Sequence, residues 1–428
     1  FRSDVTILQY AAGAPLSHES NTVIYEAPDG TLWFGNRGSS IDRLEADKVT
    51  TFVYAPGVLT SRPVSAILDD PEAGLLVGIA QRGLLQLRDG RLGPVPEAAA
   101  LADETVRVIH RTRDGRLLIG TTKGIFQRGP DRAWRPVTPP GLPQSPEVYA
   151  LLEEDDGVIW LATVGLGLVR WAPGHARAYG TGAGMVDNTL FSVVDDGSGS
   201  LWVSSARGTA RVRKTELADL DRGAVASLNC LTLGRSDGLL SGATPGSGSP
   251  SAFLLSDGRL LTATSGGFSV VEPRRFPVNT QPPNVIIESV VADDQPLALA
   301  SGRAITVPPG TNRLEIRYTA LSLIAPQRLR FRYRLEGSDA GWVEAGRDRI
   351  AHYTHLAPGP YAFHVLACNN DGVWTTTGAT LALNVQPLFY QTLWFRLMGL
   401  TALGGVLAGG ISLRVRGLKQ RELALGRA

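Results

Sequence analysis

One short motif recurs along residues 1–275 at a nearly constant interval, and it limits the fold more than any other feature. Each copy places a tight turn before a run of apolar residues, as in DGTLWFG at residues 29–35 and DGVIWLA at residues 156–162. We define the second large residue of each run as its anchor, which gives Trp33, Leu76, Leu118, Trp160, Trp202 and Leu261. The first four intervals between anchors are nearly equal, and only the last, from Trp202 to Leu261, is longer. The repeated interval falls within the period of about 40 to 45 residues that is typical of one four-stranded β-propeller blade.

The sequence around each anchor also follows a common order. A β-rich run comes first, then an Asp-Gly pair or a similar turn, then an apolar strand; glycine suits such a turn because it accepts a positive φ. Another glycine follows shortly after each anchor, at Gly38, Gly83, Gly124, Gly167, Gly208 and Gly267. Helices are not expected, because no long segment has apolar residues at spacings of three and four. Residues 1–275 therefore predict an all-β propeller, either six-bladed or seven-bladed with one blade missing or split at the N-terminus.

The pattern changes after a proline-rich segment, residues 276–283, which predicts a stiff linker. Strand-like runs separated by turn residues follow at residues 285–291, 313–319, 329–335, 359–368 and 380–385. Several short strands within about 100 residues favour a small, immunoglobulin-like antiparallel β-sandwich, here over residues 284–387.

An uncharged run at residues 397–413 lies near the C-terminus, and with its flanks it predicts one transmembrane helix over residues 392–414. Tyr390 and Trp394 lie where an aromatic belt is expected. Basic residues gather beyond the other end, at Arg414, Arg416, Lys419 and Arg421. The positive-inside rule then places residues 1–390 outside and the C-terminus in the cytoplasm, with residues 415–428 beginning a signalling helix. A buried core helix is the alternative interpretation of the apolar run.

The repeats resemble the two-component regulator propeller repeats of bacterial sensor histidine kinases. Trp33, Trp160 and Trp202 fit the tryptophan of that repeat, whereas Leu76, Leu118 and Leu261 depart from it. The segments YRLEGSDAGW at residues 333–342 and YTHLAPGPYAFHVLACNNDGVW at residues 353–374 resemble the triple-tyrosine (Y_Y_Y) domain that follows the propeller in the same receptors. Tyr333, Tyr353 and Tyr361 occupy its tyrosine positions.

The resemblance implies the extracytoplasmic ligand-sensing and signal-relay part of a bacterial two-component receptor, in the inner membrane. Its output domain, a histidine kinase or else a diguanylate cyclase, would lie outside these residues, so this fragment is not expected to be an enzyme. The expected partners are a small-molecule or oligosaccharide ligand, the membrane and a second copy of the chain. A membrane-tethered propeller lyase or hydrolase and a structural adhesion ectodomain are the alternatives.

Several motifs that suggest chemistry have simpler structural interpretations. Residues 234–238, Gly234-Arg235-Ser236-Asp237-Gly238, match the nucleophile elbow pattern, but no helix is expected after them. His352, His355 and His364 are clustered, yet the odd spacing of the first two points them to opposite faces of a strand. The three anchor tryptophans are interpreted as packing between blades and not as a sugar-binding platform. We therefore predict no catalytic residue, metal site or cofactor, and the ligand-binding residues stay unassigned.

Charge and cysteine content exclude two further classes. The 42 Lys and Arg residues nearly balance the 40 Asp and Glu residues, so no basic field for nucleic acid is present. Cys230 and Cys368 are too few for a disulfide scaffold; they are expected to be two buried thiols, and a bridge between them in an oxidising compartment is the alternative.

Overall fold

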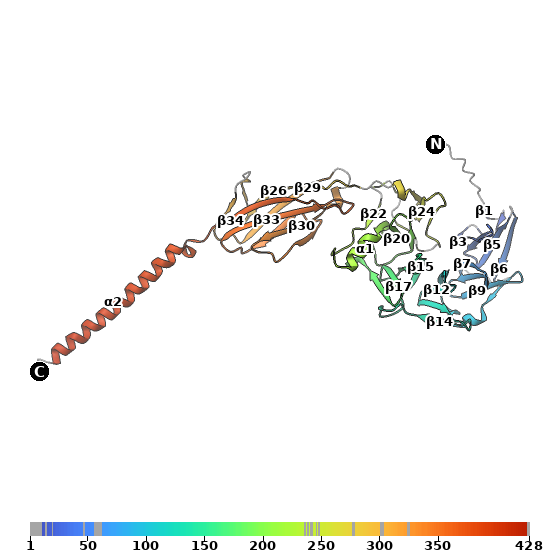
Figure 1. Cartoon of the computed structure of the whole chain (residues 1–428), viewed down its shortest axis with the longest axis horizontal. Coiled ribbons are helices and arrows are strands. Elements are labelled where there is room, and N and C mark those ends of the chain that lie inside the picture. The colour runs from blue at the N-terminus through green and yellow to red at the C-terminus, as the bar shows by residue number, and fades with distance from the viewer. Residues whose placement is uncertain are drawn as a thin grey trace. The chain divides into compact units, whose positions relative to one another are not determined.

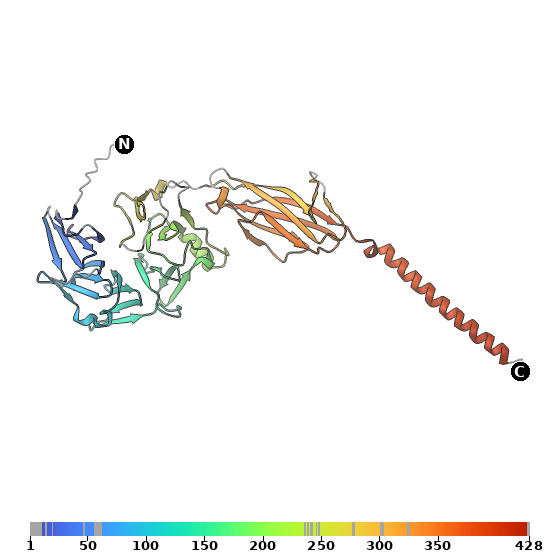
Figure 2. The same cartoon turned by 180° about the vertical axis from the view of Figure 1, so that it is seen from behind.

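The computed structural model describes all residues except 1–10, 13–14, 19, 46–47, 55–61, 235–236, 238, 240–242, 245, 247–248, 276–278, 300–303, 323–325 and 426–428. It divides into two compact units, Phe1–Pro277 and Val278–Ala428. In the described residues the first unit contains six sheets of three or four strands, which follow one another around a common centre (Figures 1 and 2).

The strands of the six sheets are consecutive in the chain and pair in chain order. The first three sheets contain β3 (Asn21–Glu26), β4 (Leu32–Asn36), β5 (Ser40–Glu45) and β6 (Lys48–Val53); β7 (Val64–Asp70), β8 (Gly74–Ile79), β9 (Gly83–Arg88) and β10 (Arg91–Pro94); and β11 (Val106–Arg111), β12 (Leu117–Thr121), β13 (Gly124–Arg128) and β14 (Trp134–Val137). The last three contain β15 (Val148–Glu153), β16 (Ile159–Thr163), β17 (Leu168–Ala172) and β18 (His175–Tyr179); β19 (Ser192–Asp195), β20 (Ser200–Ser205), β21 (Gly208–Arg213) and β22 (Leu231–Leu233); and β23 (Ala252–Leu254), β24 (Leu260–Thr264) and β25 (Gly267–Val271). The smaller elements are β1 (Ala11–Ala12), β2 (Pro15–Leu16), η1 (Pro96–Leu101), η2 (Thr181–Ala183), α1 (Lys214–Asp221) and η4 (Pro273–Arg275).

Apolar side chains from successive sheets pack against one another, and the anchors lie in these layers. Trp33, Trp160 and Trp202 are 7%, 3% and 1% exposed. Trp202 packs with Ala252 and Leu260 of the next sheet. The all-β propeller prediction and the packing role of the anchor tryptophans are therefore confirmed.

One prediction for this unit is wrong, because a helix does occur in it. In α1 only Leu217 is buried, so the helix is too short to produce a recognisable apolar period. α1 also explains most of the extra length in the last interval between anchors. It lies between the third strand β21 and the outer strand β22, whereas a short turn joins the corresponding strands of the first four sheets.

The second unit is a sandwich of two sheets with strand orders β27-β26-β29-β32 and β28-β34-β33-β30-β31. Its strands are β26 (Asn284–Ala292), β27 (Gln295–Leu297), β28 (Ile305–Val307), β29 (Arg313–Leu321), β30 (Arg330–Glu336), β31 (Val343–Gly346), β32 (Ile350–Thr354), β33 (Gly359–Cys368) and β34 (Ala379–Val385), with η5 (Pro326–Arg328) and η6 (Phe389–Gln391). Tyr318, Phe331 and Phe363 are fully buried between the sheets. The predicted strands and the sandwich are confirmed.

The last element is α2 (Leu393–Leu425), a helix of 33 residues. Its segment Leu393–Gly417 is long and apolar enough to cross a membrane, with a mean hydropathy of 1.4. None of this window is buried, whereas a core helix of a water-soluble protein would be covered by its neighbours. Length and composition therefore fit the predicted single span.

Candidate ligand-binding site

The turns after the innermost strands of the propeller carry charged side chains that bridge neighbouring sheets. Arg111, at the end of β11, donates to Asp70 Oδ2 at 2.6 Å and to Glu72 Oε1 at 3.0 Å in the preceding sheet. The Asp70 side chain is fully buried, and the Arg111 side chain is 27% exposed. This pair joins the second and third sheets at one end of the ring.

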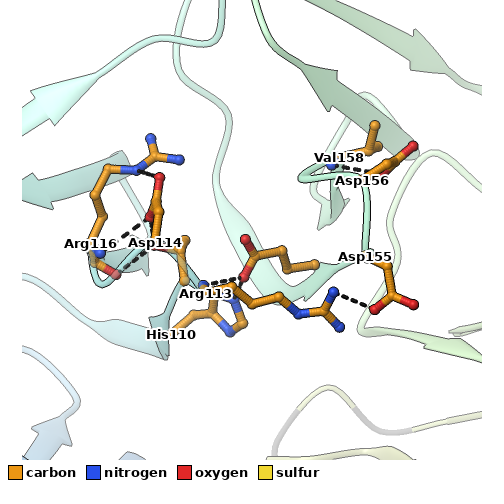
Figure 3. A network of polar contacts seen from close by, with 9 residues as sticks. His110, Arg113, Asp114, Arg116, Asp155, Asp156 and Val158 are labelled. Atoms are coloured by element: carbon orange, nitrogen blue, oxygen red, sulfur yellow. Dashed lines mark hydrogen bonds and ion pairs between the residues drawn. The ribbon is translucent and has the colours of Figure 1, made fainter.

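The next contact joins the third and fourth sheets (Figure 3). Arg113 extends from the turn after β11 to form an ion pair with Asp155 in the turn after β15. The backbone N–H of Arg113 also donates to Glu153 Oε2 at 2.9 Å. His110 Nε2 lies 3.3 Å from the same oxygen. Each turn is also stabilised by a hydrogen bond between its own residues. Asp114 accepts a hydrogen bond from Arg116 Nε, and Asp156 accepts one from the backbone N–H of Val158.

Lys214, the first residue of α1, joins the fourth and fifth sheets. Its Nζ forms ion pairs with Glu154 and, at 2.7 Å, with Asp195 Oδ2. Burial alone would lower the pKa of Lys214, but hydrogen bonds to these two carboxylates outweigh it and raise that pKa. Lys214 therefore stays charged and links two turns that are separate in the sequence.

These turns line a groove of about 470 Å³ that is open to solvent. It is lined by Leu152 and by charged residues, namely Arg113, Glu153, Glu154, Asp155, Asp156, Asp195 and Lys214. The five carboxylates outnumber the two cations. The groove can thus accept hydrogen bonds from hydroxyl or ammonium groups, and its charge disfavours anions. We take it as the candidate ligand-binding site.

A second group of side chains lies at the opposite, N-terminal ends of the inner strands. Arg107, Tyr149 and Phe191 occupy the same position of three successive repeats, each at an equal distance before its anchor. The Arg107 guanidinium lies 4.4 Å from the Tyr149 ring centre, and the Tyr149 and Phe191 rings are 5.1 Å apart. Arg107 is also paired with Glu147 at 3.5 Å. These contacts account for the three side chains as packing between inner strands.

The pKa of Asp70 leads to a stability prediction. Burial alone would raise that pKa, but hydrogen bonds from Arg111 and from the N–H groups of Ala73 and Glu72 hold it below its ordinary value of 3.8. The stabilisation is therefore present above pH 3.8 and is lost as the pH falls through the lower pKa of the folded state. We expect Asp70→Asn to cost about 1–3 kcal/mol of stability at pH 7. Urea unfolding at several pH values should give a flatter dependence between pH 4 and 2 for the variant; equal slopes would contradict this account.

The structure does not bring the three clustered histidines together as a metal site. His352 on β32 lies 3.7 Å from Glu315, and His364 on β33 contacts Thr380 and Glu336. His355 follows β32, whose sheet does not include β33. Within the described part of the chain no group of three metal-ligating side chains occurs.

The nucleophile-elbow motif can be followed only in part. Arg235, Ser236 and Gly238 lie outside the described residues. Gly234 follows β22, and its N–H donates to Asp237 Oδ2 at 2.9 Å. Cys230 and Cys368 are not joined in a disulfide, as predicted; Cys368 is buried, whereas Cys230 is only partly buried.

The three tyrosines of the sandwich have structural contacts. Tyr353 is 8% exposed, and its hydroxyl donates to Asp339 Oδ2 at 2.8 Å. Burial, and secondly this hydrogen bond to a carboxylate, raise the pKa of Tyr353. Tyr333 packs edge-on against Tyr353, and the Tyr361 hydroxyl donates to the Ala357 carbonyl. The same carboxylate of Asp339 accepts from the Leu335 N–H at 2.6 Å, so the Tyr353 contact fixes the 335–339 turn.

The groove residues were not identified from the sequence, although a signal for them exists. Arg111 pairs with Asp70, Arg113 with Asp155, and His110 with Glu153, and in each pair the two residues belong to successive repeats. Each separation along the chain is close to one repeat period. Opposite charges one period apart near the turn are therefore the pattern that predicts contacts between blades.

Comparison with known proteins agrees with the resemblance seen in the sequence. Residues 322–386 match the Y_Y_Y domain model, which covers Tyr333, Tyr353 and Tyr361. Histidine kinase P4 of Formosa agariphila is 24% identical over 254 residues, which is 56% of this chain and 17% of that protein. The chain thus spans a small part of this curated relative.

One solved structure supports the fold. The extracellular domain of a protein from B. thetaiotaomicron, described as a hybrid two-component system, matches with a TM-score of 0.67 and 18% identity. That match covers 87% of this chain and 51% of the other. A second such extracellular domain from the same organism is 17% identical over 89% of this chain and 52% of its own length, with a TM-score of 0.45. The first match confirms a propeller followed by a sandwich.

Proposed function

We propose that this chain is the extracytoplasmic ligand-sensing and signal-relay part of a bacterial two-component-type receptor. The observation that carries the proposal is the order of its parts: a propeller, a Y_Y_Y sandwich and one exposed apolar helix. A propeller presents variable loops for binding, and a single helix is the shortest route for a signal through a membrane. The similarity to a histidine kinase and to an extracellular domain of a two-component system supports the same function.

In this proposal α2 crosses the bacterial inner membrane once. Residues 1–390 lie in the periplasm, and the chain after Arg414 lies in the cytoplasm. Two features support this direction. The aromatic residues Tyr390 and Trp394 precede the apolar segment, and Arg414 and Arg416 follow it. The output domain, a histidine kinase or a diguanylate cyclase, would be attached on the cytoplasmic side, and the fragment itself would have no catalytic activity.

The receptor would act as a homodimer, because one helix can transmit a shift or rotation only relative to a second element. The helix sequence permits close approach of two copies, since Gly405 and Gly409 have the spacing of a small-residue dimer motif. Ligand binding would then bias two arrangements of the helix pair.

The groove between the turns of the third to fifth sheets would receive the ligand. Its excess of carboxylates suits an uncharged, hydroxyl-rich molecule such as an oligosaccharide, or one with an amino group. Asp155 is readily accessible to such a ligand, because its side chain is 96% exposed.

A thermal-shift screen of residues 1–386 tests this function. Neutral, amino-substituted and acidic oligosaccharides of equal length should be compared, and a binder should raise the melting temperature with its concentration. For Asp155→Asn, the ligand concentration that produces a given rise in melting temperature should increase about tenfold. Asp257→Asn, in the corresponding turn of the sixth sheet, should leave that concentration unchanged. If no compound shifts the transition and a polymer is cleaved instead, the lyase or hydrolase alternative replaces the receptor.

A further inference from the structure

A small cavity lies between the second and third sheets of the propeller, and it shares no lining residue with the groove described above. Its volume is about 100 Å³. An engineered cavity of about 150 Å³ in another protein holds one benzene molecule. The cavity here therefore has room for one small group, such as a carboxylate or a sulfate, and not for a whole sugar ring.

One wall of the cavity belongs to the core that the two sheets share. Leu76, Leu84 and Trp134 line this wall, and they are 2%, 3% and 5% exposed. All three pack in one apolar cluster with residues of both sheets. Because side chains in a close-packed core hold fixed positions, the wall keeps its shape without a ligand.

Three arginines also line the cavity, and they come from both sheets. Arg88 is the last residue of β9, Arg128 is the last residue of β13, and Arg132 lies in the turn between β13 and β14. The Arg132 N–H donates to the Gly129 carbonyl at 2.9 Å, which fixes this turn. Arg128 lies directly opposite Trp134 in its strand pair, so its backbone is held next to the core.

The charges of these three arginines are not neutralised within the protein. Among the described residues, none of the three guanidinium groups forms a hydrogen bond or an ion pair, whereas Arg135 in the same hairpin pairs with Asp131. Two carboxylates line the cavity, but Glu72 is bonded to Arg111 at 3.0 Å. Glu97 is therefore the one carboxylate of the lining that is left against three cations.

An excess of positive charge around a partly buried cavity favours an anion. Like charges that share a site repel one another, and this repulsion is screened less next to a protein core than in bulk water. A guanidinium presents parallel N–H donors that match the oxygen atoms of a carboxylate, a sulfate or a phosphate. Such a group would accept hydrogen bonds from more than one arginine, whereas a neutral hydroxyl would leave the charges unbalanced.

We propose that this cavity binds one small oxyanion, with Arg128 at the centre of the site and Arg88 and Arg132 at its mouth. Arg128 is half-buried, whereas the other two side chains are exposed. The oxyanion is a free ion such as sulfate or phosphate, or the acidic group of a small acidic molecule. The site is separate from the groove, whose carboxylates disfavour anions, so it does not depend on the proposed sensing function.

Equilibrium dialysis of the full chain in detergent against radiolabelled sulfate, at low ionic strength, tests the proposal. The parent chain should bind a single sulfate in a saturable manner. Arg128→Gln should raise the dissociation constant about tenfold, because it removes a charged donor at the centre of the site. Arg135→Gln is the matched control, since it removes the same charge from the same hairpin but does not line the cavity, and it should leave the dissociation constant unchanged.

A second variant keeps the test independent of folding. Arg88 is exposed, so Arg88→Gln should keep the melting temperature of the parent and still raise the dissociation constant about threefold. Displacement of the label by glucuronate would identify the acidic group of a small molecule as the ligand, and displacement by phosphate alone would identify a free ion. The proposal is overturned if the parent shows no saturable binding, or if Arg135→Gln weakens binding as much as Arg128→Gln does.

Discussion

Replacing Trp202 with alanine is expected to lower the unfolding free energy of the propeller by about 3–5 kcal/mol. Trp202 is 1% exposed and packs with Leu233, Ala252 and Leu260, so the substitution leaves a cavity between the fifth and sixth sheets. It also removes the donor to Asp196 Oδ2, which Trp202 Nε1 contacts at 3.0 Å. Urea unfolding followed by the remaining fluorescence and by circular dichroism measures the loss.

Trp202→Phe is the matched control, because it keeps most of the ring and removes only the indole N–H. Its expected cost is about 1–3 kcal/mol, mainly from the loss of the indole N–H donor to the buried Asp196 Oδ2. A loss below about 1 kcal/mol for Trp202→Ala would mean that the fifth and sixth sheets do not share a core.

The second large effect is expected in the sandwich, where Phe363→Ala should also cost about 3–5 kcal/mol. Phe363 is fully buried, and its ring lies 6.1 Å from Tyr318, 5.8 Å from Tyr333 and 6.4 Å from Tyr353 between ring centres. Because Phe363 and Trp202 lie in different compact units, each variant should shift the unfolding of its own unit. Differential scanning calorimetry of residues 1–386 resolves the two effects.

Tyr361→Phe provides the control for the sandwich. Its hydroxyl donates to the Ala357 carbonyl at an exposed position, so its loss should cost about 1 kcal/mol or less. If Phe363→Ala had an equally small effect, the aromatic cluster would not be the core of the Y_Y_Y domain.

The fold was predictable because its main determinant is local and repeated. A turn followed by an apolar strand around Trp33, Trp160 and Trp202 fixes two strands of each blade within a short stretch of sequence, and the period fixes the rest. The sandwich strands around Phe331 and Phe363 were predictable for a similar reason. Each is a short segment of alternating apolar and polar residues, or of continuous apolar residues, bounded by turn residues.

The parts that were missed depend on contacts between distant residues. Arg113 and Asp155 belong to different blades, and nothing next to either residue in the sequence marks the pair. The helix α1 escaped prediction because Leu217 is its one buried residue. Phe268 on β25 is 72% exposed, and this could not be predicted either, because the sequence of β25 resembles that of the buried third strands.

The central claim is that α2 crosses the membrane once and leaves the propeller and the sandwich outside the cytoplasm. Single cysteines, introduced after Cys230 and Cys368 have been replaced by serine, answer this directly in intact cells, using a thiol reagent that crosses the outer membrane but not the inner one. The account predicts that Ser256→Cys, in the sixth sheet, and Asp348→Cys, in the sandwich, are labelled before lysis, whereas Ala428→Cys is labelled only after it. Labelling of all three only after lysis, or of Ala428→Cys before it, would contradict the proposed receptor.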